Sequence, residues 1–413
     1  MIVRSLHLEN FRCFEHLELA FQEDLTVLFG WNGVGKTAVV DALALVLSNM
    51  IGNAPESLRD SDIRLTTVET SGAWVRQRAE AVEILVRAVD RGAETSCTLS
   101  KKKGRSSEGP VQSPSRRRLA KRSKDAVPPL LAVYRAGRAW SGESRPERDG
   151  DNGSEGHANA LDAGYAGALD AGRELSGLRS WWRQQDHMRA RGLPSPALEA
   201  VEIAVQQSIQ GCDAPPEFAP ELDDIIVKTE HGRFSLGELS DGQRGVVSLV
   251  ADVARRAALL AEAWETGSFD LQAATGVVLV DEIDLHLHPE WQRRVLRTLA
   301  QVFPKIQFIV TTHAPAVLGS VANRQVKLFT PQGVSDRVQH VEDRDVNSIV
   351  SEVMNLGSRT KRGEQYVREL YDAIEEGELD HARTLLARLR ERWGDLDVEV
   401  LRATSFLEEE LGS

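Results

Sequence analysis

Cysteine is scarce in this sequence, and long apolar runs are absent. The 413 residues include three cysteines (Cys13, Cys97 and Cys212), and no two of them form a CxxC pair. This spacing argues against a disulfide framework and a structural zinc site, and it favours a reducing compartment. No run of about 18 apolar residues occurs, and the first residues lack the apolar segment of a signal peptide. We therefore expect a cytoplasmic protein that is neither secreted nor membrane-spanning.

The sequence also lacks a net positive charge, with one local exception. The net charge of -12 argues against a generally basic protein that coats nucleic acid. Residues 101–124, however, contain ten Lys or Arg and a single Glu. Such a block repels itself and is typical of a solvated or disordered loop, but it could equally contact the phosphates of a nucleic acid. Both interpretations stay open at this point.

Hydrophobic periodicity predicts an α/β fold. Apolar and polar residues alternate over residues 2–21, which indicates two antiparallel strands. Short apolar runs at residues 25–30, 276–282 and 307–313 alternate with helical patterns, as in a largely parallel sheet. We therefore predict a mixed sheet with helices on both faces, a helical lobe and a C-terminal helical hairpin.

The same patterns divide the chain into five expected segments. Two of them would form the core, and the other three would be a basic and Gly-rich insert that is partly disordered, a helical lobe and a C-terminal helical region with a turn at Gly377. The core segments are residues 1–100 and 234–345. The insert is residues 101–177, the helical lobe is 178–233 and the C-terminal region is 346–413.

GWNGVGKT (residues 30–37) matches the phosphate loop G-x-x-x-x-G-K-[ST] in full, between an apolar strand and a helix. Glycines let the backbone curl so that its N–H groups face a phosphate, and the helix N-terminus adds partial positive charge. Lys36 would reach the β- and γ-phosphates, and the Thr37 hydroxyl would hold Mg²⁺. The expected ATP-binding residues are Gly30, Trp31, Asn32, Gly33, Val34, Gly35, Lys36, Thr37, Ala38 and Arg12.

VVLVDE (residues 277–282) places two carboxylates at the end of a buried strand. Because successive side chains of a strand point to opposite sides, each carboxylate can take a separate task. Asp281 would support Mg²⁺, and Glu282 would orient and polarise the attacking water. The simpler alternative is that both are acidic residues at the start of the next helix.

LSDGQR (residues 239–244) precedes a long amphipathic helix, so that a hydroxyl, backbone N–H groups and the helix dipole can all point at an anion. It resembles the ABC signature LSGGQ, with an aspartate in place of the first glycine. The corresponding residues are Leu239, Ser240, Asp241, Gly242 and Gln243. A turn that merely caps the helix would need the serine, but not the following Gly-Gln.

Three histidines follow the second core strand. His313 ends the apolar run QFIVTTH, beside the expected phosphate site, where we predict a role in catalysis together with Glu282 and Lys36. His286 and His288 lie two residues apart and could share a face, but no further ligand is evident, and zinc normally takes four. We therefore do not expect a metal at this pair.

The opening LHLENFRCFEHLELAF, together with GWNGVGKT and DEIDLHLHP, resembles the RecF/SMC/OLD branch of ABC ATPases. The resemblance implies that ATP and Mg²⁺ are bound and ATP is hydrolysed in a head-to-tail dimer, where the signature caps the γ-phosphate held by the other subunit. It also implies a switch role for His313 and contact of DLHLHP with the opposite subunit. A transporter subunit would not need the insert or the long tail, and no sustained heptads indicate an SMC arm.

Further segments, including SDIRL (61–65), PPLLAVYRAGRAW (128–140) and DVNSIVSEVMNLGSR (345–359), resemble the ATPase of Septu anti-phage systems, a type that also accompanies some retrons. This implies higher oligomers, no nuclease centre of its own, and an HNH-type nuclease partner restrained or released by the ATP state. The alternative is a stand-alone RecF-like DNA-binding ATPase of repair or recombination, which would use residues 101–124. Arg12 and Arg64 would approach nucleotide or form exposed salt bridges, and VYRAGR departs from the Septu pattern around Arg138.

Overall fold

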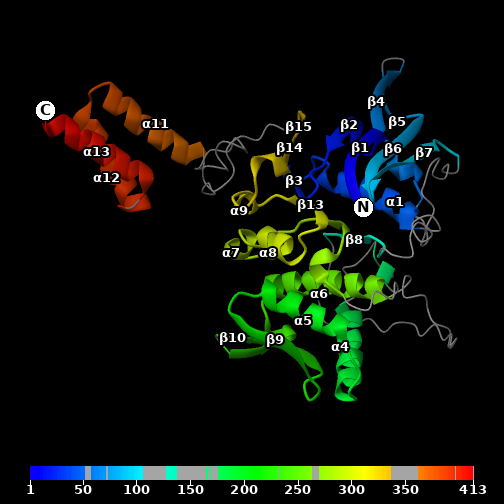
Figure 1. Ribbon diagram of the computed structural model, residues 1–413. Coiled ribbons are helices and arrows are strands. Elements are labelled where there is room, and N and C mark those ends of the chain that lie inside the picture. Colours follow the sequence, from blue (N-terminus) through cyan, green and yellow to red (C-terminus); the bar gives the residue numbers. More distant parts are fainter. Residues whose placement is uncertain are drawn as a thin grey trace. The chain divides into compact units, whose positions relative to one another are not determined.

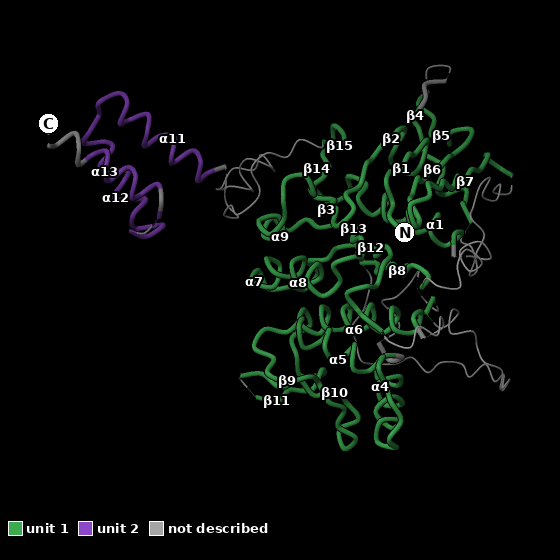
Figure 2. Tube along the Cα trace, viewed as in Figure 1, with its two compact units in different colours: residues 1–343 green, residues 344–413 purple. Residues whose placement is uncertain are grey.

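The computed structural model divides the chain into two compact units, residues 1–343 and 344–413 (Figure 2). Each unit is described by itself. The described residues are 1–51, 57–70, 73–105, 127–136, 164–165, 168, 175–230, 232–262, 269–335, 361–395 and 397–412. Most of the basic segment 101–124, Arg138 and residues 346–360 lie outside these ranges.

A six-stranded sheet forms the centre of the first unit (Figure 1). Five parallel strands are buried nearly throughout, as expected when both faces of a sheet are covered. A short antiparallel strand, β15, closes one edge. In spatial order the strands are β15 (Gly333–Ser335), β14 (Val326–Thr330), β3 (Leu25–Gly30), β13 (Ile306–Thr312), β12 (Gly276–Val280) and β8 (Leu130–Tyr134). The predicted α/β class with a mixed sheet is confirmed.

A second sheet is antiparallel and has the order β2-β1-β6-β7. Its strands are β1 (Ile2–Phe11), β2 (Phe14–Ala20), β6 (Ala81–Asp90) and β7 (Ala93–Lys102). The predicted antiparallel pair at residues 2–21 is thus confirmed as β1 and β2. A separate hairpin pairs β4 (Leu65–Thr70) with β5 (Ala73–Arg78).

Helix α1 (Lys36–Ile51) packs against both sheets, and most of its residues are buried. A helix that is apolar all round is expected in such a position. The side-chain amide of Gln307 also ties the sheets together. It accepts from the Val3 N–H at 2.8 Å and donates to the Val3 carbonyl at 2.8 Å and to the Gln22 carbonyl at 2.7 Å. The helix α1, which starts directly after the end of β3, thus packs between two sheets that are joined to each other.

Residues 175–235 differ from the helical lobe that the sequence predicts. Two helices, α4 (Leu175–Ala190) and α5 (Pro196–Ser208), are followed by a three-stranded antiparallel sheet. Its strands are β9 (Cys212–Ala219), β10 (Asp224–Thr229) and β11 (Gly232–Ser235). Pro215 and Pro216 obscure the first strand in the sequence, and they are tolerated because β9 is an edge strand.

The boundary expected for the insert also needs correction. Residues 101–177 are not all outside the core, because β8 lies within them and pairs in parallel with β12. The apolar island at residues 128–140 therefore contributes a strand of the central sheet.

The remaining helices of the first unit link these parts. The long helix α6 (Asp241–Glu262) lies between the six-stranded sheet and the lobe, in contact with β8 and α5 (Figure 1). Three shorter helices follow β12 and β13, namely α7 (Pro289–Gln292), α8 (Val295–Val302) and α9 (Pro315–Leu318).

In the second unit, the described residues 361–395 and 397–412 form three helices, α11 (Lys361–Glu375), α12 (Leu379–Trp393) and α13 (Val398–Gly412). Nine residues form its buried cluster, Leu370, Ala373, Ala382, Leu385, Leu386, Leu389, Val400, Ala403 and Leu407. The predicted turn at Gly377 separates α11 from α12, and the left-handed φ of +76° there suits glycine. Among the described residues, no helix is long and apolar enough to cross a membrane.

Candidate functional site

The phosphate loop, residues 30–37, joins the buried strand β3 to α1. Gly33 and Gly35 have φ values of +81° and +103°, a region that other residues rarely adopt. At Gly35 there is no space for a side chain, because a Cβ would lie 2.4 Å from the Phe14 ring and 2.7 Å from Cys13 Sγ. The loop can therefore bring backbone N–H groups close to an anion.

The Lys36 side chain lies over this loop. Its ammonium donates to the carbonyl oxygens of Gly30 at 2.6 Å and Trp31 at 2.7 Å. Burial lowers the pKa of Lys36, and this effect is opposed by the carboxylates of Asp281, Asp284 and Glu282. Lys36 thus lies within the electrostatic reach of all three acids that follow β12.

The other loop residues differ in exposure. Trp31, Asn32 and Gly33 are exposed, and the Trp31 ring is a large apolar group left 44% accessible. Val34 and Gly35 are partly buried, whereas Ala38 is buried inside α1. Ala38 can therefore contribute its backbone but little side-chain surface to a ligand.

The predicted metal pair meets at the carboxyl end of the sheet. Thr37 Oγ1 donates to Asp281 Oδ1 at 3.3 Å, although the two residues are 244 positions apart. A second hydroxyl, Thr311 Oγ1 on β13, donates to the same oxygen at 2.5 Å. Asp281 is 2% exposed. Hydroxyl and carboxylate oxygens are hard ligands of the kind that Mg²⁺ prefers.

Glu282 is fixed by its backbone. Its N–H donates to Thr311 Oγ1 at 2.8 Å, and its φ of +51° is uncommon for a residue with a side chain. The next residue, Ile283, donates its N–H to the Thr311 carbonyl at 2.9 Å. Thr311 therefore holds the backbone on which both carboxylates stand. Sequence reasoning singled out His313 at this strand end but missed Thr311.

His313 lies at the same edge, just after β13, and its side chain is 47% exposed. Its Nδ1 lies 3.3 Å from Asp284 Oδ2, and Asp284 is itself only 3% exposed. A buried carboxylate on Nδ1 sets the ring's orientation and leaves Nε2 as the nitrogen available to a ligand. Asp284 is a second residue that sequence reasoning missed, although DEID contains it.

The signature residues begin α6. Ser240 Oγ lies 3.0 Å from Gln243 Oε1, and the Gln243 N–H donates back to Ser240 Oγ at 3.4 Å, so that the two residues cap the helix. Leu239 is partly buried, whereas Ser240 and Asp241 are exposed, and Asp241 pairs with Arg244.

Gly242 brings the signature against the loop after β12. A Cβ at this position would lie 2.5 Å from the His286 carbonyl oxygen and 3.1 Å from Leu287 Cα. His288, two residues after His286, caps the helix α7, because its Nδ1 accepts from the Glu290 N–H at 3.4 Å. Of the two histidines that could have suggested a metal pair, His288 therefore caps a helix with its side chain, and the backbone of His286 lies against Gly242.

Comparison with known proteins agrees with this geometry. One AAA domain model matches residues 5–123, and a second, whose description adds an AbiEii toxin of a Type IV TA system, matches residues 217–319. The chain is 41% identical to the ATPase of retron Vc95 from Vibrio cholerae over 110 residues (27% of the chain), and 41% identical to the Septu protein PtuA of Bacillus mycoides over 94 residues (23%). It is 50% identical to RecF of Thermomicrobium roseum over 46 residues (11%). In these segments the chain is similar to ATPases of the RecF/SMC branch.

The aligned segments span 20%, 12% and 12% of those three relatives' own lengths. Among solved structures, an SMC head bound to the C-terminal winged-helix domain of ScpA is 18% identical, with a TM-score of 0.48 over 79% of this chain and 94% of that one.

Arg12 lies beside α1. With Arg135 it forms ion pairs to the two oxygens of Asp41, a buried residue one turn after Thr37. Arg12 Nε also lies 3.3 Å from Asp62 Oδ1, and the Arg12 side chain stays 37% exposed. Arg64, in contrast, pairs with the exposed Glu15 at 2.7 Å. Arg135, which sequence reasoning did not select, immediately follows β8.

A buried polar cluster connects α6 to the carboxylates. The Tyr134 hydroxyl donates to Asp252 Oδ2 at 2.8 Å, and the Tyr134 carbonyl accepts from the Asp281 N–H at 2.7 Å. Arg255 and Arg256 bind the same aspartate at 2.8 and 2.7 Å. Burial alone would raise the pKa of Asp252, but the two guanidinium groups outweigh it and the pKa is lowered. Burial, reinforced by Asp252, raises the pKa of Tyr134 well above its ordinary value.

Proposed function

We propose that this chain is an ABC ATPase that binds ATP with Mg²⁺ and hydrolyses it at a site shared by two copies of the chain, and that the resulting change of assembly regulates a nuclease partner. The observation that carries the proposal is the meeting of Thr37, Asp281 and Glu282 around Thr311 at the carboxyl end of the sheet. These residues come from three separate parts of the sequence.

The residues fit the ligand that they would hold. At Gly35 a side chain would collide with Phe14 and Cys13, so the loop needs glycine there for the curled backbone whose N–H groups would face a phosphate. Thr37 and Asp281 supply oxygen ligands for Mg²⁺, which when bound neutralises charge on the phosphate oxygens. Lys36 would exchange its two carbonyl contacts for the β- and γ-phosphates, and Glu282 would orient and polarise the water.

The signature supports a site between two chains. Ser240 stands exposed at the N-terminus of the 22-residue helix α6, where a hydroxyl and the helix dipole both favour an anion. In ABC ATPases this element completes the site of the partner subunit, as the sequence analysis set out. We therefore propose a head-to-tail dimer, which could build higher oligomers. In it, the exposed His313 would donate from Nε2 to the γ-phosphate.

The nuclease partner is proposed from the relatives alone. The matches to a retron ATPase and to a Septu protein support the resemblance noted in the sequence, and that resemblance implies an anti-phage role in which an HNH-type nuclease supplies the nucleic-acid cleavage. Such an ATPase would act in the cytoplasm, where phage nucleic acid and ATP meet. The second candidate, a stand-alone RecF-like ATPase that binds DNA through residues 101–124, is favoured by the match to RecF and by the charge of that segment.

The first experiment compares Glu282→Gln with the wild type. We expect the variant to bind ATP but to lose turnover by about 100-fold or more, the usual contribution of general acid–base catalysis. Light scattering with and without ATP should then show an increased mass that persists in the variant. Lys36→Ala, which cannot hold the phosphates, is the matched control and should show no increase. An unchanged mass of Glu282→Gln on ATP addition would contradict assembly driven by ATP.

The partner is tested by affinity purification from the native host. Copurification of a small HNH protein supports the nuclease function. If no nuclease copurifies and deletion of residues 101–124 abolishes salt-sensitive DNA binding, the RecF-like candidate replaces it.

A further inference from the structure

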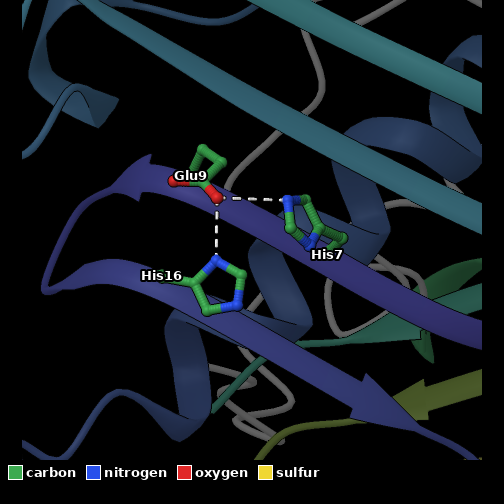
Figure 3. Close-up of side chains that lie close together, drawn as sticks. All are labelled: His7, Glu9 and His16. Atoms are coloured by element: carbon green, nitrogen blue, oxygen red, sulfur yellow. Dashed lines mark hydrogen bonds and ion pairs between the residues drawn. The ribbon is translucent and has the colours of Figure 1, made fainter.

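The outer face of the β1–β2 hairpin carries a cluster of two histidines and a glutamate. On β1, Leu6 and Leu8 are buried, so the alternate residues His7 and Glu9 point away from the core. The antiparallel register pairs Glu9 directly with His16 on β2. The cluster of His7, Glu9 and His16 thus lies on the opposite face of the sheet from its buried core (Figure 3).

The three side chains converge on one point. Glu9 Oε1 lies 3.3 Å from His7 Nε2 and 2.7 Å from His16 Nδ1. The two imidazole rings meet edge to face, with centroids 4.9 Å apart. One potential ligand atom from each of the three residues lies within 4.8 Å of the other two. Figure 3 shows the Glu9 carboxylate placed between the two rings.

These separations suit a tetrahedral metal ion. Zn²⁺ binds imidazole nitrogen and carboxylate oxygen at about 2.0–2.2 Å, so neighbouring ligand atoms in a tetrahedron lie about 3.3–3.6 Å apart. The measured 3.3 Å already matches, and the 2.7 Å contact needs an outward shift of under an ångström by Glu9 or His16. Their side chains are 42% and 55% exposed, which leaves them free to make it.

We propose that His7, Glu9 and His16 form a binding site for a divalent transition metal, with Zn²⁺ as the physiological occupant. Two imidazoles and one carboxylate favour Zn²⁺, Co²⁺ or Cu²⁺ over Mg²⁺ and Ca²⁺, which prefer oxygen ligands alone. Three protein ligands leave a fourth position open. The exposed Glu18, paired with His7 across the hairpin, or a water molecule can fill it.

A metal here would join two neighbouring strands. Its ligands come from both arms of the hairpin, and β2 is an edge strand of its sheet. Because the ion binds the paired strands and not the unfolded chain, it stabilises the folded state by mass action. The site is distinct from the phosphate loop, whose proposed Mg²⁺ ligands, Thr37 and Asp281, belong to α1 and to the end of β12.

The test measures Zn²⁺ binding to the full-length protein by isothermal titration, in buffer with excess Mg²⁺ so that the oxygen site is saturated. We expect one equivalent of Zn²⁺ per chain and a rise in the melting temperature. His7→Ala and His16→Ala should each weaken binding at least 10-fold, and Glu9→Gln should also weaken it while keeping the shape of the side chain.

His187→Ala is the matched control, because it removes an exposed histidine of α4 outside the cluster and should bind Zn²⁺ as the wild type does. All variants should melt like the wild type without Zn²⁺, since the replaced side chains are partly exposed. Zn²⁺ affinity and stoichiometry that are unchanged in the His7→Ala, His16→Ala double variant would overturn the proposal, as would the absence of Zn²⁺ binding by the wild type.

Discussion

Thr311→Val tests whether one buried hydroxyl positions both carboxylates. Valine keeps the shape of threonine but removes an oxygen that donates to Asp281 Oδ1 at 2.5 Å and accepts from the Glu282 N–H at 2.8 Å. A hydrogen bond to a charged group contributes about 1.5–3 kcal/mol, and an orphaned buried N–H costs about 1–3 kcal/mol. Because both effects act in the variant, we expect its unfolding free energy to fall by about 2.5–6 kcal/mol.

Turnover should fall more than ATP binding does. A loss of about 1.4–2.7 kcal/mol in positioning corresponds to a 10- to 100-fold decrease in kcat. The affinity for ATP should change little, because the phosphate loop keeps its contacts. Steady-state ATPase assays and nucleotide titration measure the two quantities separately.

Thr26→Val is the matched control for this experiment. Thr26 is likewise buried, on the neighbouring strand β3, but its hydroxyl accepts from the Gln22 N–H at the amino end of the strand. This variant should lose stability and keep its kcat. If Thr311→Val and Thr26→Val have equal kcat values, Thr311 does not position the carboxylates and the reasoning is refuted.

Two further variants test the surroundings of the site. Gly242→Ala should displace the loop at His286, lower the stability by about 1–3 kcal/mol and lower turnover. Gly237→Ala is the control, because the nearest atom to its added Cβ would be 3.4 Å away, and it should change neither quantity. Thermal melts measure the stability and ATPase assays measure turnover. Asp252→Asn should lower the unfolding free energy by about 3–5 kcal/mol, because the buried charge of Arg256 loses the carboxylate that neutralises it. Since the folded pKa of Asp252 is lowered, its contribution is present above the unfolded pKa and is lost as pH falls through the folded one. Urea unfolding across acidic pH should therefore show a flatter curve for the variant, and parallel curves would contradict this role.

The elements with strong local patterns could be predicted from the sequence. The phosphate loop and the carboxylate strand each stand in a short segment whose apolar run and following polar residues define them. Residues that act across the sheet could not be found in this way. Thr311 is one of two adjacent threonines at the end of a strand, and only the β12–β13 pairing shows which one reaches Asp281.

The same reason explains the other differences. His7 and His16 become neighbours through strand register, which a sequence pattern does not reveal. Strand β9 contains two prolines, so its edge position had to be known before it could be recognised as a strand. Strand β8 lies between two segments of polar composition, which made it look like part of the insert.

The most direct test of the shared site combines two inactive chains. Lys36→Ala removes the phosphate contact, and Ser240→Arg blocks the signature. In a head-to-tail dimer of one chain of each kind, both defects fall on one site and the other site is intact. Complexes purified through a different tag on each chain should therefore hydrolyse ATP at about half the wild-type rate, while either variant alone stays inactive. A purified mixed complex that is as inactive as the single variants would contradict a site built from two subunits.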